Sequence, residues 1–471
     1  MKGRLFYGMS IPKELEEAYT QGYRQFSWIA PMVEESLSLR DYFENSRSIY
    51  QGQRFYWQTP DKQSTLVGLG KELEFQGARA SITEIAAFIA ANKAIIYQNR
   101  TVEGAGAVLC GAFPFDKTHS DTKEWGTMGQ GLFYLPTFLL TQQGTHKYST
   151  INFSAQSIDE LVGKWQTLTA QLSAICQLEA ADIATVGIIQ QEEVAVNQWM
   201  DLVNKTVSQL TAPGPLEKVV LARQMKVVGE KPFQSEAILR NLQSQQTMTY
   251  FFALEHEAQL FIGASPERLL KATKDAFLTA SIAGSVSRGT TVQEDQQLGE
   301  QLLHDLKNRQ EHQIVVDRIV TELSKLTTAD LSIQQPELLK NRDIQHLFLP
   351  IEGNRKPGID FLDGIQQLHP TPALGGEPKE LALQWLRSHE PLQRGLYGAP
   401  IGWLAIKEDI GEFAVGIRSA LVVQETSYLF AGCGIVKESQ AAAEREETRI
   451  KFRPMLRGIG GTTYDQPVRH D

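Results

Sequence analysis

The sequence is poor in cysteine. Its three cysteines, Cys110, Cys176 and Cys433, lie far apart along 471 residues and form no C-x-x-C pair. A disulfide framework or a thiolate metal site needs paired or closely spaced cysteines, so the sequence disfavours both. We expect the three side chains to be small, buried hydrophobic groups.

Long hydrophobic runs are also missing. The most apolar helical stretch, residues 82–96, contains Glu84 and Lys93 and is shorter than the roughly 20 apolar residues of a membrane span. The first residues carry charge before any apolar segment of the kind that a signal peptide requires. These absences predict a cytoplasmic protein with no membrane partner.

Several common catalytic motifs are absent as well. The sequence has no G-x-x-x-x-G-K-[ST] loop, no G-x-S-x-G elbow and no H-E-x-x-H motif. Gly104, Gly106 and Gly111 do not form G-x-G-x-x-G ahead of a helix. Phosphate-loop, serine-hydrolase, zinc-protease and dinucleotide chemistry are therefore disfavoured.

Positive charge is in deficit, with 46 basic against 55 acidic side chains and a formal net charge of −9. Nucleic-acid binding needs clustered lysine and arginine, so no nucleic-acid partner is expected. A small acidic substrate is still compatible, because a pocket can be basic inside an acidic surface. The hydrophobic fraction of 42 % is that of a globular protein with a large core.

Strand-like and helix-like segments come in blocks. Before a Pro-Gly-Pro breaker at residues 213–215, we expect strands at 105–113, 131–140 and 148–153, and helices that start at Ser81 and Ser157 or span 192–210. After it, we expect strands at 217–228, 248–254, 259–264, 268–272, 277–283, 397–405, 412–423 and 427–433, and helices at 292–306, 308–326 and 445–456. Such blocks predict an α+β, or layered α/β, fold. Residues 211–460 hold the dense motifs and form the expected catalytic region, 1–210 are the N-terminal part of the fold, and 461–471 are a tail.

Two residues in the second half suit acid–base chemistry. Lys218 lies in a strand-like run with apolar neighbours, and it is either a surface lysine with a covered stem or, if buried, a general base. Glu267 follows a predicted strand. It either caps the next segment or, inside a closed pocket, has a raised pKa and acts as a general acid.

Three carboxylates on predicted helices suit a hard cation. Glu311 lies on one helix, and Glu444 and Glu447 are three residues apart on another, so the latter two share a helix face. Mg²⁺ takes one or two protein carboxylates and keeps several waters. The alternative for such a cluster is a solvated acidic surface.

A charged residue in an apolar setting suggests carboxylate recognition. Arg418 lies in a predicted apolar strand, where a charge is costly without a partner, and a bidentate hold on a substrate carboxylate would explain it. Gly284 and Gly432 lie in glycine-containing segments whose backbone amides can approach an anion.

Eight segments in this order resemble the chorismate-utilising enzymes. They are LEKVVLAR, FIGASPERLL, SIAGSVSRG, KNRQEHQIVVD, QHLFLPIEG, LHPTPALGG, GEFAVGIRSAL and AGCGIVKESQAAAEREETRIKFRPML, between residues 216 and 456. The resemblance implies a single large fold of antiparallel sheets flanked by helices, around a cleft that binds chorismate and Mg²⁺.

The resemblance also implies residue roles. Lys218 would activate water, Glu267 would protonate the leaving hydroxyl, and Glu311 and Glu447 would hold Mg²⁺, with Glu444 reaching it through water. Arg418 and the backbone around Gly284 and Gly432 would bind the enolpyruvyl carboxylate. Three further positions match residues near the substrate or the metal: His346, Ser419 and Lys451. For His346, a core histidine is the alternative.

Within the family, the nucleophile distinguishes subgroups. Amine-forming members typically carry Gln where Lys218 stands, and members with a nucleophilic lysine carry it where Ala283 stands. The pattern implies water as the nucleophile, an isochorismate synthase (an isomerase), and no glutaminase subunit. The long N-terminal half and residues 54–70 resemble the menaquinone-specific branch. The alternatives are a siderophore-pathway isochorismate synthase, a salicylate synthase, an aminating enzyme and a non-catalytic chorismate-binding protein.

Two residues depart from the usual family pattern. Ser285 stands in place of the common threonine, and Arg445 in place of the common aromatic residue. Neither lies among the residues that the resemblance assigns to the chemistry, but both bear on the geometry around the substrate pocket.

Overall fold

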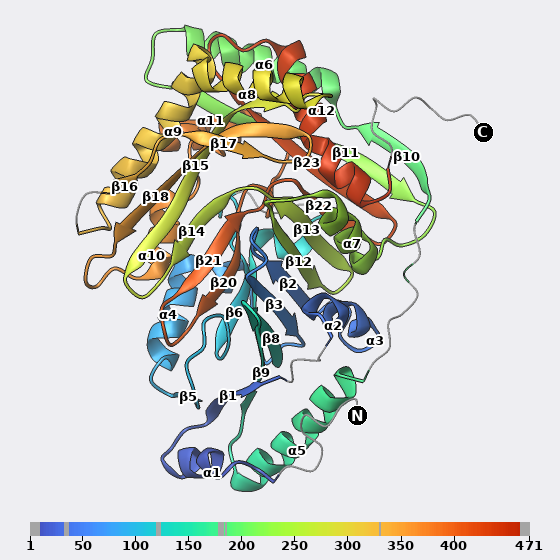
Figure 1. The fold of residues 1–471 in the computed structure, drawn as a ribbon, viewed down its shortest axis with the longest axis vertical. Coiled ribbons are helices and arrows are strands. Elements are labelled where there is room, and N and C mark those ends of the chain that lie inside the picture. The colour runs from blue at the N-terminus through green and yellow to red at the C-terminus, as the bar shows by residue number, and fades with distance from the viewer. Residues whose placement is uncertain are drawn as a thin grey trace.

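Two large β-sheets form the centre of the protein (Figure 1). The computed structural model describes residues 10–32, 37–118, 124–177, 183, 186–328 and 331–461. The 13-stranded sheet runs in the order β10 (Ile188–Glu193), β11 (Lys218–Gly229), β23 (Thr426–Ile435), β22 (Ser419–Val423), β13 (Gln259–Ser265), β12 (Tyr250–His256), β2 (Arg54–Gln58), β3 (Ser64–Leu69), β8 (Phe138–Gln143), β9 (His146–Ser154), β1 (Gln25–Pro31) and β5 (Ile96–Gln98), with β19 (Gly376–Glu377) beside β11. The 10-stranded sheet runs β16 (Ser332–Ile333), β18 (Ile344–Asn354), β15 (Ala276–Ser287), β14 (Arg268–Ala272), β21 (Gly411–Val415), β20 (Pro400–Ala405), β6 (Val108–Ala112), β7 (Leu132–Leu135) and β4 (Leu73–Gln76), with β17 (Glu337–Lys340) beside β18.

The helices cover the sheets unevenly. At one end of the molecule lie α6 (Val196–Thr211), α8 (Val292–His304), α9 (Leu306–Ser324), α11 (Lys379–His389) and α12 (Ala441–Gly458), and at the opposite end lie α1 (Lys13–Thr20) and α5 (Ile158–Ile175) (Figure 1). The other helices are α2 (Leu39–Asn45), α3 (Arg47–Tyr50), α4 (Ile82–Asn92), α7 (Ser235–Gln245) and α10 (Phe361–Leu368). No helix in the described part of the chain has the length and apolar character to cross a membrane.

Two neighbouring segments pass from one sheet to the other. β13 of the larger sheet continues through Glu267 into β14 of the smaller sheet, and β21 of the smaller sheet continues through Arg418 into β22 of the larger. The Ala264 amide donates to the Arg418 carbonyl at 3.0 Å, and the Val415 amide donates to the Glu267 carbonyl at 3.0 Å. Glu267 and Arg418 therefore lie at one junction, although they are far apart in the sequence.

The predicted fold class is confirmed, because both sheets are dominated by antiparallel pairs and are flanked by helices. The helix predicted to start at Ser157 begins there, with the Ser157 hydroxyl accepting a hydrogen bond from the Glu160 amide, and it ends at Ile175. All three cysteines are free thiols, and Cys110 and Cys433 are buried as expected, while Cys176 is partly exposed.

Three predicted elements were wrong in extent. Residues 412–423 form two strands, because Arg418 has a left-handed backbone (φ 48°) that interrupts the strand predicted to contain it. Residues 131–140 are divided between β7 and β8, with Pro136 between them. The helix predicted from residue 192 begins at Val196, because residues 188–193 pair with β11.

The two halves of the chain share both sheets. β2 pairs with β12 in the larger sheet, and β6 pairs with β20 in the smaller. Residues 1–210 thus complete sheets whose other strands come from residues 211–460, and the assignment of the chemistry to the second half stays a prediction. Residues 462–471 of the predicted tail lie outside the described residues.

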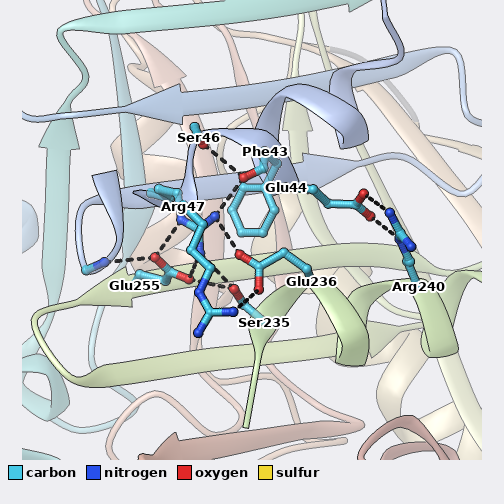
Figure 2. Close-up of polar contacts among 10 residues, drawn as sticks. Phe43, Glu44, Ser46, Arg47, Ser235, Glu236, Arg240 and Glu255 are labelled. Carbon is cyan, nitrogen blue, oxygen red and sulfur yellow. Dashed lines mark hydrogen bonds and ion pairs between the residues drawn. The ribbon is translucent and has the colours of Figure 1, made fainter. Parts of the chain in front are cut away.

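A buried arginine links the two halves. Arg54 of β2 is 1 % exposed and donates from Nε and Nη2 to the two carboxylate oxygens of Glu255 on β12, at 2.8 and 2.6 Å. Its Nη1 lies 2.7 Å from the Glu236 carboxylate and donates to the Phe43 carbonyl at 2.6 Å. Figure 2 shows Glu236, Glu255 and Ser235 close together, below Phe43.

We expect Arg54→Met to lower the free energy of unfolding by about 3–5 kcal/mol, because it leaves Glu255 and Glu236 buried without their shared cation. Urea denaturation measures the change. Lys13→Met is the control, because the Lys13–Glu17 pair is exposed, and it should change the unfolding free energy by less than about 0.5 kcal/mol. Equal effects of the two substitutions would contradict the expectation.

Candidate active site

A cavity of about 610 Å³ lies at the junction of the two sheets and contains most of the predicted site residues. Its wall is built from β11, β15, β18, β23, α9, α12 and the two crossing segments. Ten of the eleven predicted site residues line it: Lys218, Glu267, Gly284, Glu311, His346, Arg418, Gly432, Glu444, Glu447 and Lys451. Tertiary structure thus brings together residues spread over about half of the chain.

Lys218 is the first residue of β11 and is 1 % exposed, so the alternative of a surface lysine was wrong. Its Nζ donates to Glu311 Oε1 of α9 at 2.9 Å. Gly434 of the neighbouring strand β23 makes room for this pair, because a Cβ there would lie 2.6 Å from Lys218 Cε and 3.1 Å from Glu311 Oε1. The lysine is therefore held at the cavity wall by a partly exposed carboxylate.

Glu267 is buried at the crossing from β13 to β14. Burial raises the pKa of its carboxyl to about 7, although the charges of Arg418, Lys451 and Lys218 oppose the rise. Its backbone amide donates a hydrogen bond to the Ser265 hydroxyl at 3.2 Å, and its carbonyl accepts one from the Val415 amide of β21. Near neutral pH this carboxyl can both hold and release a proton, as a general acid requires.

The three carboxylates predicted for a metal come from two helices. Glu311 on α9 pairs with Lys218, and Glu447 on α12 pairs with Lys451 at 2.6 Å. Glu444, one turn before Glu447, is buried. Among the residues that the structure describes, no three histidine, cysteine, aspartate or glutamate side chains converge closely enough to form a metal site as they stand.

Arg418, His346 and Ser285 form a chain of contacts in the cavity wall. Arg418 is 9 % exposed, and its Nη2 lies 3.5 Å from His346 Nε2. The Nδ1 atom of His346 lies 2.8 Å from the Ser285 hydroxyl. Burial lowers the pKa of His346 well below its ordinary value, and the nearby charges of Arg418 and Lys451 lower it further, so the ring is neutral. Within the described residues, Arg418 has no carboxylate at ion-pair distance.

Glycine conformation shapes two points of this wall. Gly284 has φ 73°, and a Cβ there would lie 3.2 Å from Asn308. The Gly432 carbonyl accepts a hydrogen bond from Lys451 Nζ at 2.9 Å. Lys451 thus bridges β23 and Glu447 of its own helix, which places its ammonium at the cavity edge.

One predicted site residue lies apart from the cavity. The Ser419 hydroxyl is fully buried and donates to the Gly416 carbonyl at 2.9 Å, where it stabilises the turn around Arg418. A direct substrate contact by Ser419 stays a prediction. Ser285 and Tyr397 line the cavity without having been assigned a role. Ser285 had a signal, its departure from the family pattern, whereas nothing in the sequence around Tyr397 marked it.

The comparisons with known proteins identify the family. The sequence profile described as "Chorismate binding enzyme" matches residues 13–460. The isochorismate synthase MenF of Bacillus subtilis is 36 % identical over 439 residues, which cover 91 % of this chain and 92 % of that protein. The salicylate biosynthesis isochorismate synthase of Pseudomonas aeruginosa is 33 % identical and covers 86 % of this chain and 85 % of its own. The chain belongs to the chorismate-binding enzymes.

Solved structures agree with this fold. The menaquinone-specific isochorismate synthase MenF from Escherichia coli superposes with a TM-score of 0.78 at 24 % identity, covering 94 % of this chain and 98 % of its own. Anthranilate synthase component I from Streptococcus pneumoniae superposes with a TM-score of 0.68 at 19 % identity, covering 83 % of this chain and 92 % of its own. At these identities the likeness concerns the fold, and the predicted fold family is confirmed.

The raised pKa of Glu267 predicts a pH-dependent stability. The folded protein binds this proton more tightly than the unfolded chain, so the contribution is complete below the ordinary value of 4.5 and is lost as the pH rises to about 7. Relative to Glu267→Gln, which cannot titrate, we expect the wild-type free energy of unfolding to fall by about 2–3 kcal/mol between about pH 5 and pH 8. Urea denaturation at both pH values tests this, and parallel pH profiles for the two proteins would refute it.

Proposed function

We propose that this protein is an isochorismate synthase, an isomerase that converts chorismate to isochorismate. One observation carries the proposal: a buried lysine, Lys218, and a buried carboxyl of raised pKa, Glu267, line the same cavity. In the reaction one water adds at C2 of chorismate and the C4 hydroxyl leaves as water. One group must accept a proton and another must donate one.

Lys218 is the proposed base. Its side chain, at the start of β11, is 1 % exposed and lines the cavity. There it would accept a proton from the water that attacks the substrate. The Glu311 carboxylate is its ion-pair partner at 2.9 Å and holds the lysine at the cavity wall.

Glu267 is the proposed acid. Its burial gives it a proton to donate near neutral pH, and its carbonyl and amide are fixed at the crossing between the sheets. Arg418, Lys451 and Lys218 lie close enough to stabilise the carboxylate that remains after donation. Lys218 and Glu267 thus divide the two proton transfers between them.

Carboxylate binding is assigned to the basic groups of the cavity. Arg418 is the best candidate for the enolpyruvyl carboxylate, because it is buried and the only hydrogen-bond partner of its guanidinium among the described residues is the neutral ring of His346. The backbone around Gly284 and Gly432 and the ammonium of Lys451 complete this part of the wall.

A magnesium ion fits the chemistry of the remaining groups. Glu311 and Glu447 are partly exposed carboxylates that line the cavity from two helices, and each forms an ion pair with a lysine. Mg²⁺ needs only one or two such ligands beside water. Glu444 would act through a water. When bound, the ion supplies Lewis-acid charge that neutralises the ring carboxylate.

The similarity to MenF supports a pathway, and the lysine at position 218 supports a choice of nucleophile. The menaquinone branch is favoured, because the relative with 36 % identity over 91 % of this chain is a MenF protein; a siderophore-pathway isochorismate synthase is the alternative. Lysine at position 218 supports water rather than ammonia as the nucleophile, so no glutaminase subunit is expected. We place the enzyme in the cytoplasm, with chorismate as its substrate.

Incubation with chorismate and Mg²⁺, followed by chromatography, tests the function. We expect isochorismate without pyruvate, and we expect Lys218→Ala to lower the rate by at least about 100-fold with unchanged folding, because it removes the base. Salicylate with pyruvate would identify a salicylate synthase, and anthranilate formed from ammonia would identify an aminating enzyme. Either result, or a Lys218→Ala rate within tenfold of wild type, would overturn the corresponding assignment.

Metal dependence tests the ligand assignment. Glu447→Gln should raise the Mg²⁺ concentration for half-maximal activity by about tenfold or more, because an amide is a weaker ligand than a carboxylate for a hard cation. Glu446→Gln, one position away and paired with Arg449 on the exposed side, is the matched control and should leave the requirement unchanged. The same requirement in both variants would refute Glu447 as a ligand.

A further inference from the structure

A second charged cluster lies outside the cavity, where β10, β11 and α12 meet. Its centre is Glu193, the last residue of β10, whose side chain is 7 % exposed. Three arginines bind this one carboxylate. Arg449 Nε lies 2.9 Å and Arg445 Nε 3.3 Å from its oxygens, and Arg223 forms the third ion pair. Three guanidiniums thus converge on the Glu193 carboxylate, and Arg449 also pairs with the exposed Glu446.

The cluster and the cavity use two different faces of the same helix. Glu444, Glu447 and Lys451 of α12 line the cavity. Arg445 and Arg449, each one or two positions away, bind Glu193 instead. Because residues three or four apart share one face of a helix, the rotation of α12 about its axis decides how far its carboxylates project into the cavity. Glu193 fixes this rotation through its ion pairs with Arg445 and Arg449, on the face of α12 that does not line the cavity.

The third arginine connects the cluster to the strand of the proposed base. Arg223 lies five positions after Lys218 on β11, so the two side chains point to opposite faces of the strand. Arg223 is 2 % exposed, donates to the Thr448 hydroxyl of α12 at 3.1 Å, and lies over the rings of Trp199 and Phe452. Glu193 thus binds both the strand that carries Lys218 and the helix that carries Glu447.

We propose that Glu193 is a positioning residue for the reaction: through Arg223, Arg445 and Arg449 it sets α12 against β11 and thereby places Glu447 and Lys451 opposite Lys218. This inference rests on the proposed function. It also gives a role to Arg445, one of the two residues that depart from the usual family pattern, because an aromatic side chain there could not bind Glu193 as an ion pair.

The structure offers a matched control in Glu44. This carboxylate is 2 % exposed and binds two arginines: Arg240, whose Nε lies 2.7 Å from Oε1, and Arg40 at 3.4 Å. Figure 2 shows the Glu44–Arg240 pair, between α2 and α7. None of its residues lines the cavity. Glu44→Gln and Glu193→Gln remove the same kind of buried ion pair, but only the second touches α12.

The test compares Glu193→Gln, Glu193→Asp and Glu44→Gln with the wild type, at a temperature well below every unfolding midpoint. For Glu193→Gln we expect the KM for chorismate and the dissociation constant for Mg²⁺, measured by calorimetry without substrate, to rise about tenfold. We expect kcat to change less. Glu193→Asp keeps the charge and should recover part of the loss, and Glu44→Gln should lower the unfolding midpoint while leaving both constants unchanged.

Each outcome decides the proposal. If Glu193→Gln lowers the unfolding midpoint but matches Glu44→Gln in KM and Mg²⁺ affinity, Glu193 is only structural and the proposal is overturned. If the wild type forms no isochorismate, the proposed function fails separately, and the calorimetric comparison of the two glutamine variants then decides alone. Equal or absent Mg²⁺ binding in that comparison overturns the positioning role.

Discussion

The site depends on one constraint, which is that two antiparallel segments cross together from one sheet to the other. The crossing of β13 into β14 carries Glu267, and the crossing of β21 into β22 carries Arg418. Backbone hydrogen bonds between the segments keep the two crossings in register. The acid Glu267 and the cation Arg418 are thereby both buried at the junction of the two sheets.

Burial of charge is the second common feature of the molecule. Lys218 with Glu311, and Lys451 with Glu447, are ion pairs at the cavity wall, while Arg54 with Glu255 and Glu193 with its arginines lie elsewhere. A buried charge is costly without a partner. The two ion pairs of the cavity differ from the other clusters because Glu311 and Glu447 are partly exposed, so a bound cation can replace the lysines as their partner.

Sequence reasoning found most of the site because its residues lie in short, dense segments. Lys218, Glu267, Arg418 and the three carboxylates were each predicted as candidates, and the structure places all of them on one cavity. It failed on local geometry. Arg418 was predicted inside a strand, but its left-handed backbone ends the strand, and the residue type alone does not predict this conformation. The strand β10 was not predicted, because residues 188–193 are largely polar and form the edge strand of the larger sheet.

By itself, the sequence determined the family, the fold class and the chemical character of the candidate residues, because these depend on residue types and on their order along the chain. Only the tertiary structure decided which charges are partners. Lys218 and Glu311 are 93 positions apart and Glu193 and Arg449 are 256 apart, and no local pattern encodes such pairs. It also decided the pKa of Glu267, because desolvation depends on everything that surrounds a group and not on its neighbours in the chain.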